Sequence, residues 1–195
     1  MSQDMVLVSQ DRYLARKKIL SVLGNKFHIF DQQQNLCFFV HQKAFKLKEA
    51  ITVYRDEQKQ HPVLTIQARS IMDFSGTYDV TDVQTGEVVG ALKRQGMKSM
   101  LRDEWHILDA DGAQIGMVVE DSMALALIRR FLSNLIPQGF TATINGVEAA
   151  TFQQNFNPFV AKYDIDLSRA EQVGLDKRLA IASVVLLLAI EGKQG

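Results

Sequence analysis

The segment RLAIASVVLLLAIE, residues 178–191, decides the fold of this chain. Its run of twelve residues between the flanking charges contains one polar side chain, Ser183, whose hydroxyl can bond to a carbonyl one helical turn earlier. A membrane-spanning helix needs about 20 apolar residues, so this run is too short to be one. Asp176 before the run is typical of a helix N-cap, and Gly192 after it is typical of a helix end. We therefore expect a compact α-helix over residues 176–191.

This helix is apolar on every side, and such a helix must be surrounded by the rest of the protein. The residues expected to form its buried surface are Leu179, Ile181, Val184, Val185, Leu187 and Leu188.

The preceding sequence supplies strands that could enclose the helix. Short alternating segments are joined in pairs by turn residues, for example GFTATI and VEAATF by Asn145-Gly146, a strong hairpin signal. Counting connectors that could add a strand, about 12 neighbouring strands are expected. At about 4.8 Å spacing and about 40° tilt they would close to a diameter near 24 Å, which fits a helix and one layer of side chains.

The sequence thus predicts a mainly β protein: a single closed antiparallel β-barrel of about 12 strands around a buried C-terminal helix. The whole chain, 1–195, is expected to form one domain. Residues 1–11 are expected to be a flexible or edge segment.

Composition excludes several classes of protein. Lysine and arginine total 22, as do aspartate and glutamate, so no overall charge attracts nucleic acid or anionic membrane. Cys37 is the only cysteine, which rules out internal disulfides and a thiolate-rich zinc site and predicts a small buried hydrophobe. No secretory signal is recognisable, so we expect a cytoplasmic protein.

One segment departs from the strand pattern. Residues 121–136 place Leu127, Phe131 and Leu135 on one side of a helix, which predicts an amphipathic helix outside or across one end of the barrel. Its apolar stripe could pack on the barrel, lie on a membrane surface or bind a protein partner.

No catalytic motif is recognisable, and we expect no catalytic residue, metal or cofactor. His28 and His106 follow aromatic residues at matching places of a weak repeat. They could form a paired metal or acid/base site, but alternation favours outward positions opposite buried aromatics. The sequence DADGA, 109–113, is interpreted as a hairpin turn, and Glu120-Asp121 as part of a solvated acidic rim.

Basic residues recur in the connectors between hairpins, and they are the strongest candidates for a binding site. If the repeat is structural, these residues could converge on one side of the barrel, where they would bind an anion. Alternatively they form an ordinary solvated face. The candidate residues for an anion or lipid site are Arg16, Lys17, Lys93, Arg94, Lys98 and Arg102.

Three segments carry a resemblance to a known family: YLARKKILSVLGNKFHIFD, DSMALALIRRFLSNLIPQGF and GLDKRLAIASVVLLLAI. In their order and spacing the chain resembles the LURP-one-related proteins of the tubby C-terminal-like superfamily. The resemblance implies a barrel threaded by its C-terminal helix. Tubby domains bind phosphoinositides through basic residues, but those residues cannot be aligned with this chain. The cysteine-rich segment of the related scramblases is absent.

The leading hypothesis is therefore a non-enzymatic binding or scaffolding module that recognises anionic phospholipid headgroups through a basic surface, peripherally and without spanning the membrane. The alternative is a protein-interaction module that uses the 121–136 helix. Nucleic acid is not expected as a partner, and an enzyme with a surface site is the least favoured reading.

Overall fold

The computed structural model describes residues 10–18, 25–42, 50–69, 76–95, 104–121, 137–155 and 160–190. The described elements are twelve strands, one short 3₁₀ helix and one α-helix. They are β1 (Arg12–Lys18), β2 (Asn25–Phe30), β3 (Leu36–Gln42), β4 (Ile51–Tyr54), β5 (Pro62–Ala68), β6 (Thr77–Asp82), β7 (Val88–Arg94), β8 (Glu104–Leu108), β9 (Gln114–Glu120), β10 (Gly139–Ile144), β11 (Val147–Asn155), β12 (Val160–Asp166), η2 (Glu171–Val173) and α3 (Lys177–Ile190).

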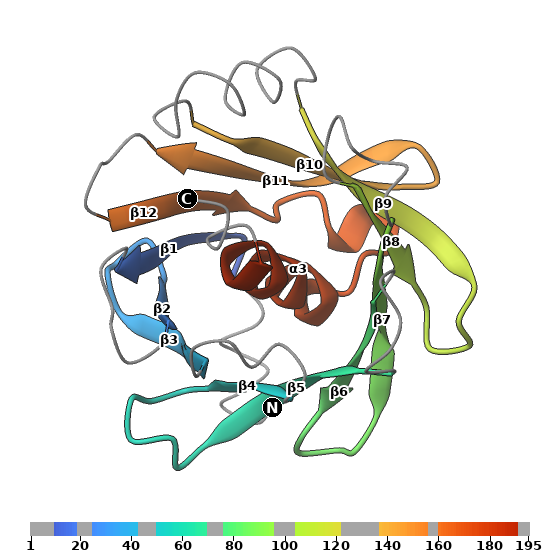
Figure 1. The fold of residues 1–195 in the computed structure, drawn as a ribbon. Coiled ribbons are helices and arrows are strands. Elements are labelled where there is room, and N and C mark those ends of the chain that lie inside the picture. Colours follow the sequence, from blue (N-terminus) through green and yellow to red (C-terminus); the bar gives the residue numbers. More distant parts are fainter. Residues whose placement is uncertain are drawn as a thin grey trace.

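The strands form one closed antiparallel barrel, as the sequence predicts. Their order around the barrel is β1-β12-β11-β10-β9-β8-β7-β6-β5-β4-β3-β2, so every pair except β1 and β12 joins strands that are consecutive in the chain. Figure 1 shows these strands surrounding α3. The β1–β12 pairing runs from Arg12 opposite Asp166 to Lys18 opposite Val160, and it closes the barrel between the two ends of the strand series.

Strand β1 comes from a segment that the sequence places among the connectors. Its alternation is clear in the structure, because Tyr13, Ala15 and Lys17 are buried while Leu14 and Arg16 are only partly buried. The lysine at an inward position weakened the hydrophobic pattern, which explains why this strand is difficult to recognise.

Helix α3 fills the interior of the barrel. Every residue from Leu179 to Ala189, including the six positions predicted to be buried, is at most 5% exposed. Asp176 caps the helix, since its Oδ1 accepts a hydrogen bond of 2.8 Å from the backbone N–H of Arg178. The Ser183 hydroxyl donates to the Leu179 carbonyl at 2.9 Å, as expected for a hydroxyl inside an apolar helix.

The N-terminal end of α3 is tied to the β6–β7 hairpin through a cluster of charges. Arg178 contacts Asp82 and Glu87 at 3.0 Å each and Asp176 at 2.7 Å. Lys177 contacts Asp11 at 3.0 Å. These ion pairs satisfy the charges that flank the apolar run and hold the helix in register with the barrel wall.

Among the residues described, no helix is both long enough and apolar enough to cross a membrane.

Candidate functional site

The antiparallel order gives the barrel two chemically different ends. At one end, which we call the turn end, the hairpins β2–β3, β4–β5, β6–β7, β8–β9 and β10–β11 turn, and the chain passes from β12 to α3. We call the other end the connector end. There the chain leaves each odd-numbered strand and enters the following even-numbered strand. All the connectors in which the sequence places basic residues therefore join strand ends at the same end of the barrel.

Charge is divided unequally between these ends. The inter-strand segments that join at the connector end contain eight basic residues and four acidic ones. The turns, together with the passage to α3, contain three basic residues and eight acidic ones. The sequence therefore has an excess of basic residues in the segments that join strands at the connector end and an excess of acidic residues in the turns, and such a division of charge can orient a protein toward a charged surface.

Lys26 and Lys93 are the clearest exposed cations on the rim of the connector end. Lys26 is the second residue of β2, Lys93 lies near the end of β7, and both side chains are exposed. Neither has an acidic partner among the described residues. Lys93 belongs to the predicted set, whereas Lys26 does not. Lys26 stands alone in the sequence between Asn25 and Phe27, so no run of basic residues marks it as a candidate.

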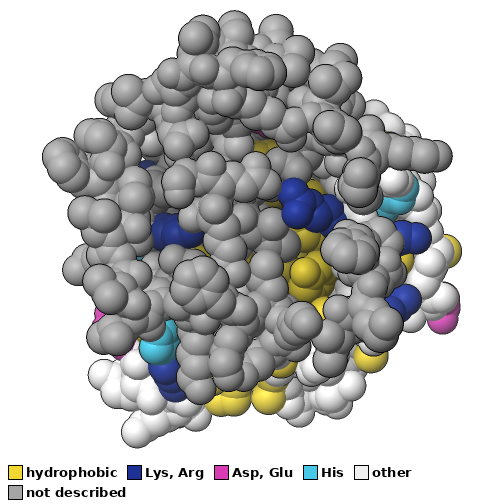
Figure 2. Space-filling model, viewed as in Figure 1, with side chains coloured by type: hydrophobic (Ala, Val, Ile, Leu, Met, Phe, Trp, Pro, Cys, Tyr) yellow, Lys and Arg dark blue, Asp and Glu magenta, His cyan; other side chains and the backbone are white. Residues whose placement is uncertain are grey.

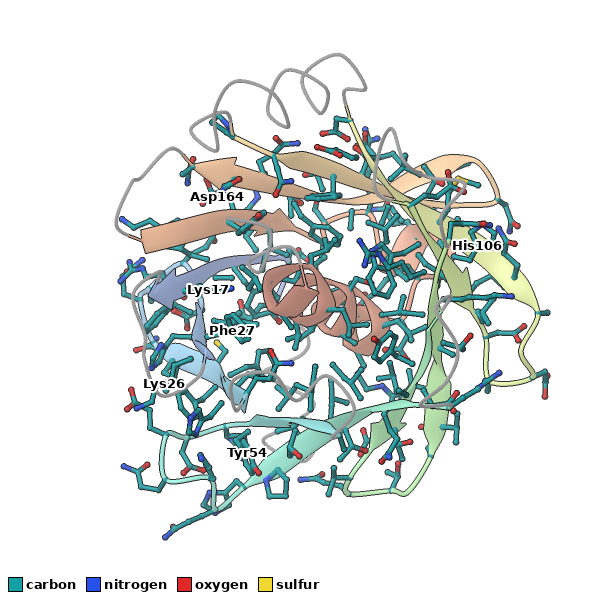
Figure 3. The ribbon with its side chains drawn as sticks, in the orientation of Figure 1. Lys17, Lys26, Phe27, Tyr54, His106 and Asp164 are labelled. Atoms are coloured by element: carbon teal, nitrogen blue, oxygen red, sulfur yellow. The ribbon has the colours of Figure 1, made fainter. Side chains whose placement is uncertain are left out.

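The predicted residues of β1 take two different directions. Arg16 lies on the outer wall, where its guanidinium donates to the Gln34 side chain and lies 4.8 Å from the centre of the Phe30 ring. Lys17 points inward, is 4% exposed, and donates from Nζ to the Leu188 carbonyl at 2.9 Å. Figure 3 shows Lys17 beside α3. Lys17 therefore caps the last turn of the core helix instead of lying on the surface expected for it.

Arg94 lies at the connector end of β7 and is partly buried. Its guanidinium carbon is 5.9 Å from the centre of the Trp105 ring, and that ring contacts Tyr78 with their centres 5.9 Å apart. The cation covers an aromatic pair at the mouth of the barrel. Burial raises the pKa of Tyr78, while the nearby positive charge of Arg94 opposes that rise.

The basic residues do not converge on one side wall. Strands β1 and β7 are separated by five strands in either direction around the barrel, so Arg16 and Lys93 lie on opposite walls. Figure 2, viewed along the barrel axis, likewise shows Lys and Arg side chains at several separated places. The described basic residues Arg16 and Lys93 therefore lie toward the same end of the barrel but on different walls, and they do not converge on one side.

Several predicted residues lie outside the described part of the chain. Lys98 and Arg102 fall between β7 and β8. The stripe of Leu127, Phe131 and Leu135, with most of the predicted helix at 121–136, falls between β9 and β10. Gly192 also lies outside it.

The two matched histidines do not form a site together. His28 on β2 and His106 on β8 are separated by five strands in either direction. Both side chains point outward and are partly buried, while Phe27 and Trp105 are buried inside the barrel. His28 contacts Glu57 at 2.9 Å. The interpretation as outward positions opposite buried aromatics is thus the correct one.

Other candidate reactive groups have structural positions. Cys37 is 1% exposed, and burial raises the pKa of its thiol to about 11, so the unreactive thiol form prevails at neutral pH. Asp109 accepts a hydrogen bond from the Ala113 N–H at 2.8 Å, confirming the hairpin turn at DADGA. Glu120 is 3% exposed, so its assignment to a solvated rim was wrong, although its neighbour Asp121 is exposed.

Comparison with known proteins identifies the family of this chain. The family model described as LOR, LURP-one-related, matches residues 36–187, which is most of the chain. The chain belongs to the LURP-one-related family. The matched range includes ten of the barrel strands and most of α3, while β1 and β2 precede it.

A solved structure has a similar chain trace. It is an X-ray structure of an Arabidopsis thaliana protein, 16% identical, and the alignment covers 90% of each chain with a TM-score of 0.49. No curated protein matches the chain. The LURP-one-related family is not a known enzyme family, and a barrel filled by a helix is consistent with a non-enzymatic module.

Proposed function

We propose that this protein is a non-enzymatic module that binds the surface of membranes containing anionic phospholipid, and that its connector end faces the lipid. One observation carries the proposal: basic inter-strand segments meet at one end of the barrel and acidic turns meet at the other. Anionic lipid headgroups attract the first end and repel the second, which defines a single orientation.

The spacing of the exposed cations favours a surface over a single small anion. Lys26 on β2 and Lys93 on β7 are separated by four strands in one direction and by six in the other. A barrel of this size is about 24 Å wide. One phosphate group cannot contact both cations, but a planar array of headgroups can. This geometry suits a membrane applied flat to the connector end.

The proposed contact set differs from the set chosen from sequence. Lys26 and Lys93 are its described members, and Lys98 and Arg102 belong to it through the connector that joins β7 to β8. Arg94 contributes less, because its guanidinium already covers Trp105. Arg16 and Lys17 are left out, since one lies along the wall and the other inside the barrel.

Each basic residue near an anionic membrane surface contributes about 1 kcal/mol to the free energy of binding, so several of them are needed. Because salt screens the charges, binding should weaken as the salt concentration rises. The test is flotation of purified protein with vesicles of neutral lipid carrying graded phosphatidylserine or phosphoinositide, at low and moderate salt. Lys93→Glu is expected to reduce the bound fraction by about five-fold or more, and Lys26→Glu/Lys93→Glu to abolish binding.

Arg169→Glu is the matched control. Arg169 is an exposed cation at the turn end, its side chain is 63% exposed, and the substitution changes net charge by the same amount as Lys93→Glu. It should leave vesicle binding unchanged. If Arg169→Glu and Lys93→Glu lost vesicle binding equally, the effect would come from net charge and not from the connector end. If the wild-type protein did not bind the vesicles, the lipid function would be excluded.

The alternative function is binding of a protein partner through Leu127, Phe131 and Leu135. These three residues belong to the segment that links β9 to β10, two strands that are connected at the connector end. Apolar contact is insensitive to salt, so capture of a partner at high salt that is lost in Phe131→Asp would support this alternative.

A further inference from the structure

A groove of about 640 Å³ lies on the outer wall of the barrel, near the turn end. It crosses three adjacent strands and is bordered by the β2–β3 turn. Its volume lies within the range of small-molecule sites, roughly 300–1,000 Å³. Two cross-strand rows form its base: Thr151, Asp166 and Arg12 in one, and Gln153, Asp164 and Leu14 in the other.

Two of the three carboxylates in the groove already have partners. Asp166 pairs with Arg12 at 3.1 Å and accepts a backbone hydrogen bond from Ser168 at 2.9 Å. Asp31 accepts two hydrogen bonds from Asn35, at 2.8 and 2.9 Å. These groups shape the groove, but their oxygens are engaged within the protein.

Asp164 differs from both. Its Oδ2 accepts a hydrogen bond of 2.6 Å from Asn155, and among the described residues no basic side chain pairs with it and its Oδ1 accepts no hydrogen bond. The residue is exposed, and Figure 3 shows it on the side of β12 away from α3. Arg12 pairs with Asp166, while Asp31 and Asp164 have only neutral amide partners among the described residues, so the groove has a net negative charge to which the exposed Asp164 contributes.

The surrounding groups suit an organic cation with a hydrocarbon stem. Gln32, Gln34, Gln153 and Thr151 also border the groove. Gln34 already accepts from Arg16 and the Gln153 amide nitrogen donates to Asp121, which leaves the Gln153 amide oxygen and the Gln32 amide as polar groups for a ligand. Leu14 supplies an apolar base on which methylene groups can lie. The described residues contain no group of three metal-ligating side chains, which argues against a bare metal ion.

We propose that this groove binds a small alkylamine, whose primary ammonium group donates to the free oxygen of Asp164 while its methylene chain lies along Leu14. The ammonium carries three donors, which match the carboxylate of Asp164 and the amide oxygens beside it. The groove lies near the turn end, so this site is separate from the rim proposed to face lipid.

The probe is 1,4-diaminobutane, with uncharged 1,4-butanediol as its matched control. Titration of ¹⁵N-labelled full-length protein, followed by backbone amide shifts, should show saturable changes at Leu14, Gln153 and Asp164 with the diamine alone. Asp164→Asn is expected to weaken binding by about ten-fold or more, the effect of losing a charged hydrogen-bond acceptor.

Asp111→Asn controls for general charge. Asp111 is exposed in the β8–β9 turn, and its substitution changes net charge by the same amount as Asp164→Asn. It should leave affinity for the diamine within about two-fold of wild type. Equal weakening by Asp111→Asn, equal binding of butanediol, or no saturable shift up to about 10 mM diamine would each overturn the proposal.

Discussion

At Gly90 the barrel wall approaches the core helix closely. Its φ angle is +152°, and a Cβ added there would lie 2.4 Å from the Leu108 carbonyl oxygen and 3.0 Å from a methyl of Leu179. The first neighbour is backbone and cannot move without disturbing the β7–β8 ladder. The second belongs to α3, whose closest packing in the barrel is against β7.

Gly90→Ala should therefore destabilise the protein by roughly 2–4 kcal/mol, through steric overlap and an unfavourable φ angle together. Urea unfolding followed by circular dichroism measures this loss. Gly146→Ala isolates the φ contribution, because its φ is +80° but nothing lies within 4 Å of the added Cβ. Its expected cost is only about 1 kcal/mol, and equal losses in the two variants would contradict the packing argument.

The lysines of the barrel strands differ in position because side chains alternate between the inside and the outside of the barrel along each strand. Lys17 caps the core helix from inside, while Lys93 and Lys26 extend from the rim. A shift of one residue along β1 would exchange the buried and exposed sides of the strand. Residue type alone therefore does not assign a lysine to a binding surface.

Helix α3 is held at both ends by charges from the barrel. Lys17 donates to a carbonyl of its last turn, and Arg178 in its first turn contacts Asp82 and Glu87 of the β6–β7 hairpin. A cation at a helix C-terminus complements the helix dipole. A cation in the first turn opposes it, and the carboxylates around Arg178 offset that cost.

The Asp82 contact makes stability depend on pH. Burial alone would raise the pKa of Asp82, but hydrogen bonds from Arg178 and from the backbone of Thr85 and Gln84 outweigh burial and lower it below 3.8. Because this carboxyl binds protons less readily when folded, its contribution to stability is complete above the unfolded pKa, about 3.9, and is lost as pH falls through the folded value.

Asp82→Asn should therefore lower the free energy of unfolding by about 1–3 kcal/mol at neutral pH. The difference from wild type should shrink as pH falls below about 4. Urea denaturation at pH 7, 5, 4 and 3 tests this, with Asp111→Asn as the control for removal of an exposed carboxylate. If the difference in the free energy of unfolding between Asp82→Asn and wild type did not change with pH, the loss of stability would come from packing and not from the charge of Asp82.

The complete barrel shields its core helix from water on all sides. Its twelve strands close through the pairing of β1 with β12, which lie at opposite ends of the strand series. The interior of α3 can be exposed only by opening this ring. The helix should thus be among the last parts of the protein to lose its hydrogen bonds.

Native-state hydrogen exchange should find the amides of Val184 to Leu187 exchanging only through global unfolding. Their apparent opening free energies should equal the free energy of unfolding from denaturant, and should fall by the same amount in Gly90→Ala. Exchange of these amides at a much lower free energy would mean that the barrel opens locally.

The polarity of the barrel predicts that its two proposed sites are independent. Asp164→Asn should leave flotation with anionic vesicles unchanged, and Lys93→Glu should leave affinity for 1,4-diaminobutane unchanged, because the sites lie toward opposite ends. Measuring both variants in both assays completes the comparison. If either substitution altered both activities, the two sites would be coupled or the charge effects nonspecific.

The chain sequence is sufficient to predict the barrel and its central helix. An apolar run of twelve residues with no polar face must be enclosed, and alternating hairpins are the only elements in the chain that can enclose it. The hairpin strands, the Asp176 cap and the Ser183 hydrogen bond follow from short-range pattern and known spacing, whereas β1, with its inward lysine, does not. These features depend on contacts between residues that are near in the chain or on periodicity, both of which sequence displays directly.

The positions of the candidate sites depend on closure of the barrel, which no short-range pattern displays. Closure places His28 and His106 on opposite walls and separates Arg16 from Lys93. It also brings β1 beside β12, and this pairing between residues about 150 positions apart builds the groove at Asp164. Alternation shows that two residues lie on opposite faces of a strand, but only the ring order shows which strands are neighbours and which end each charge faces.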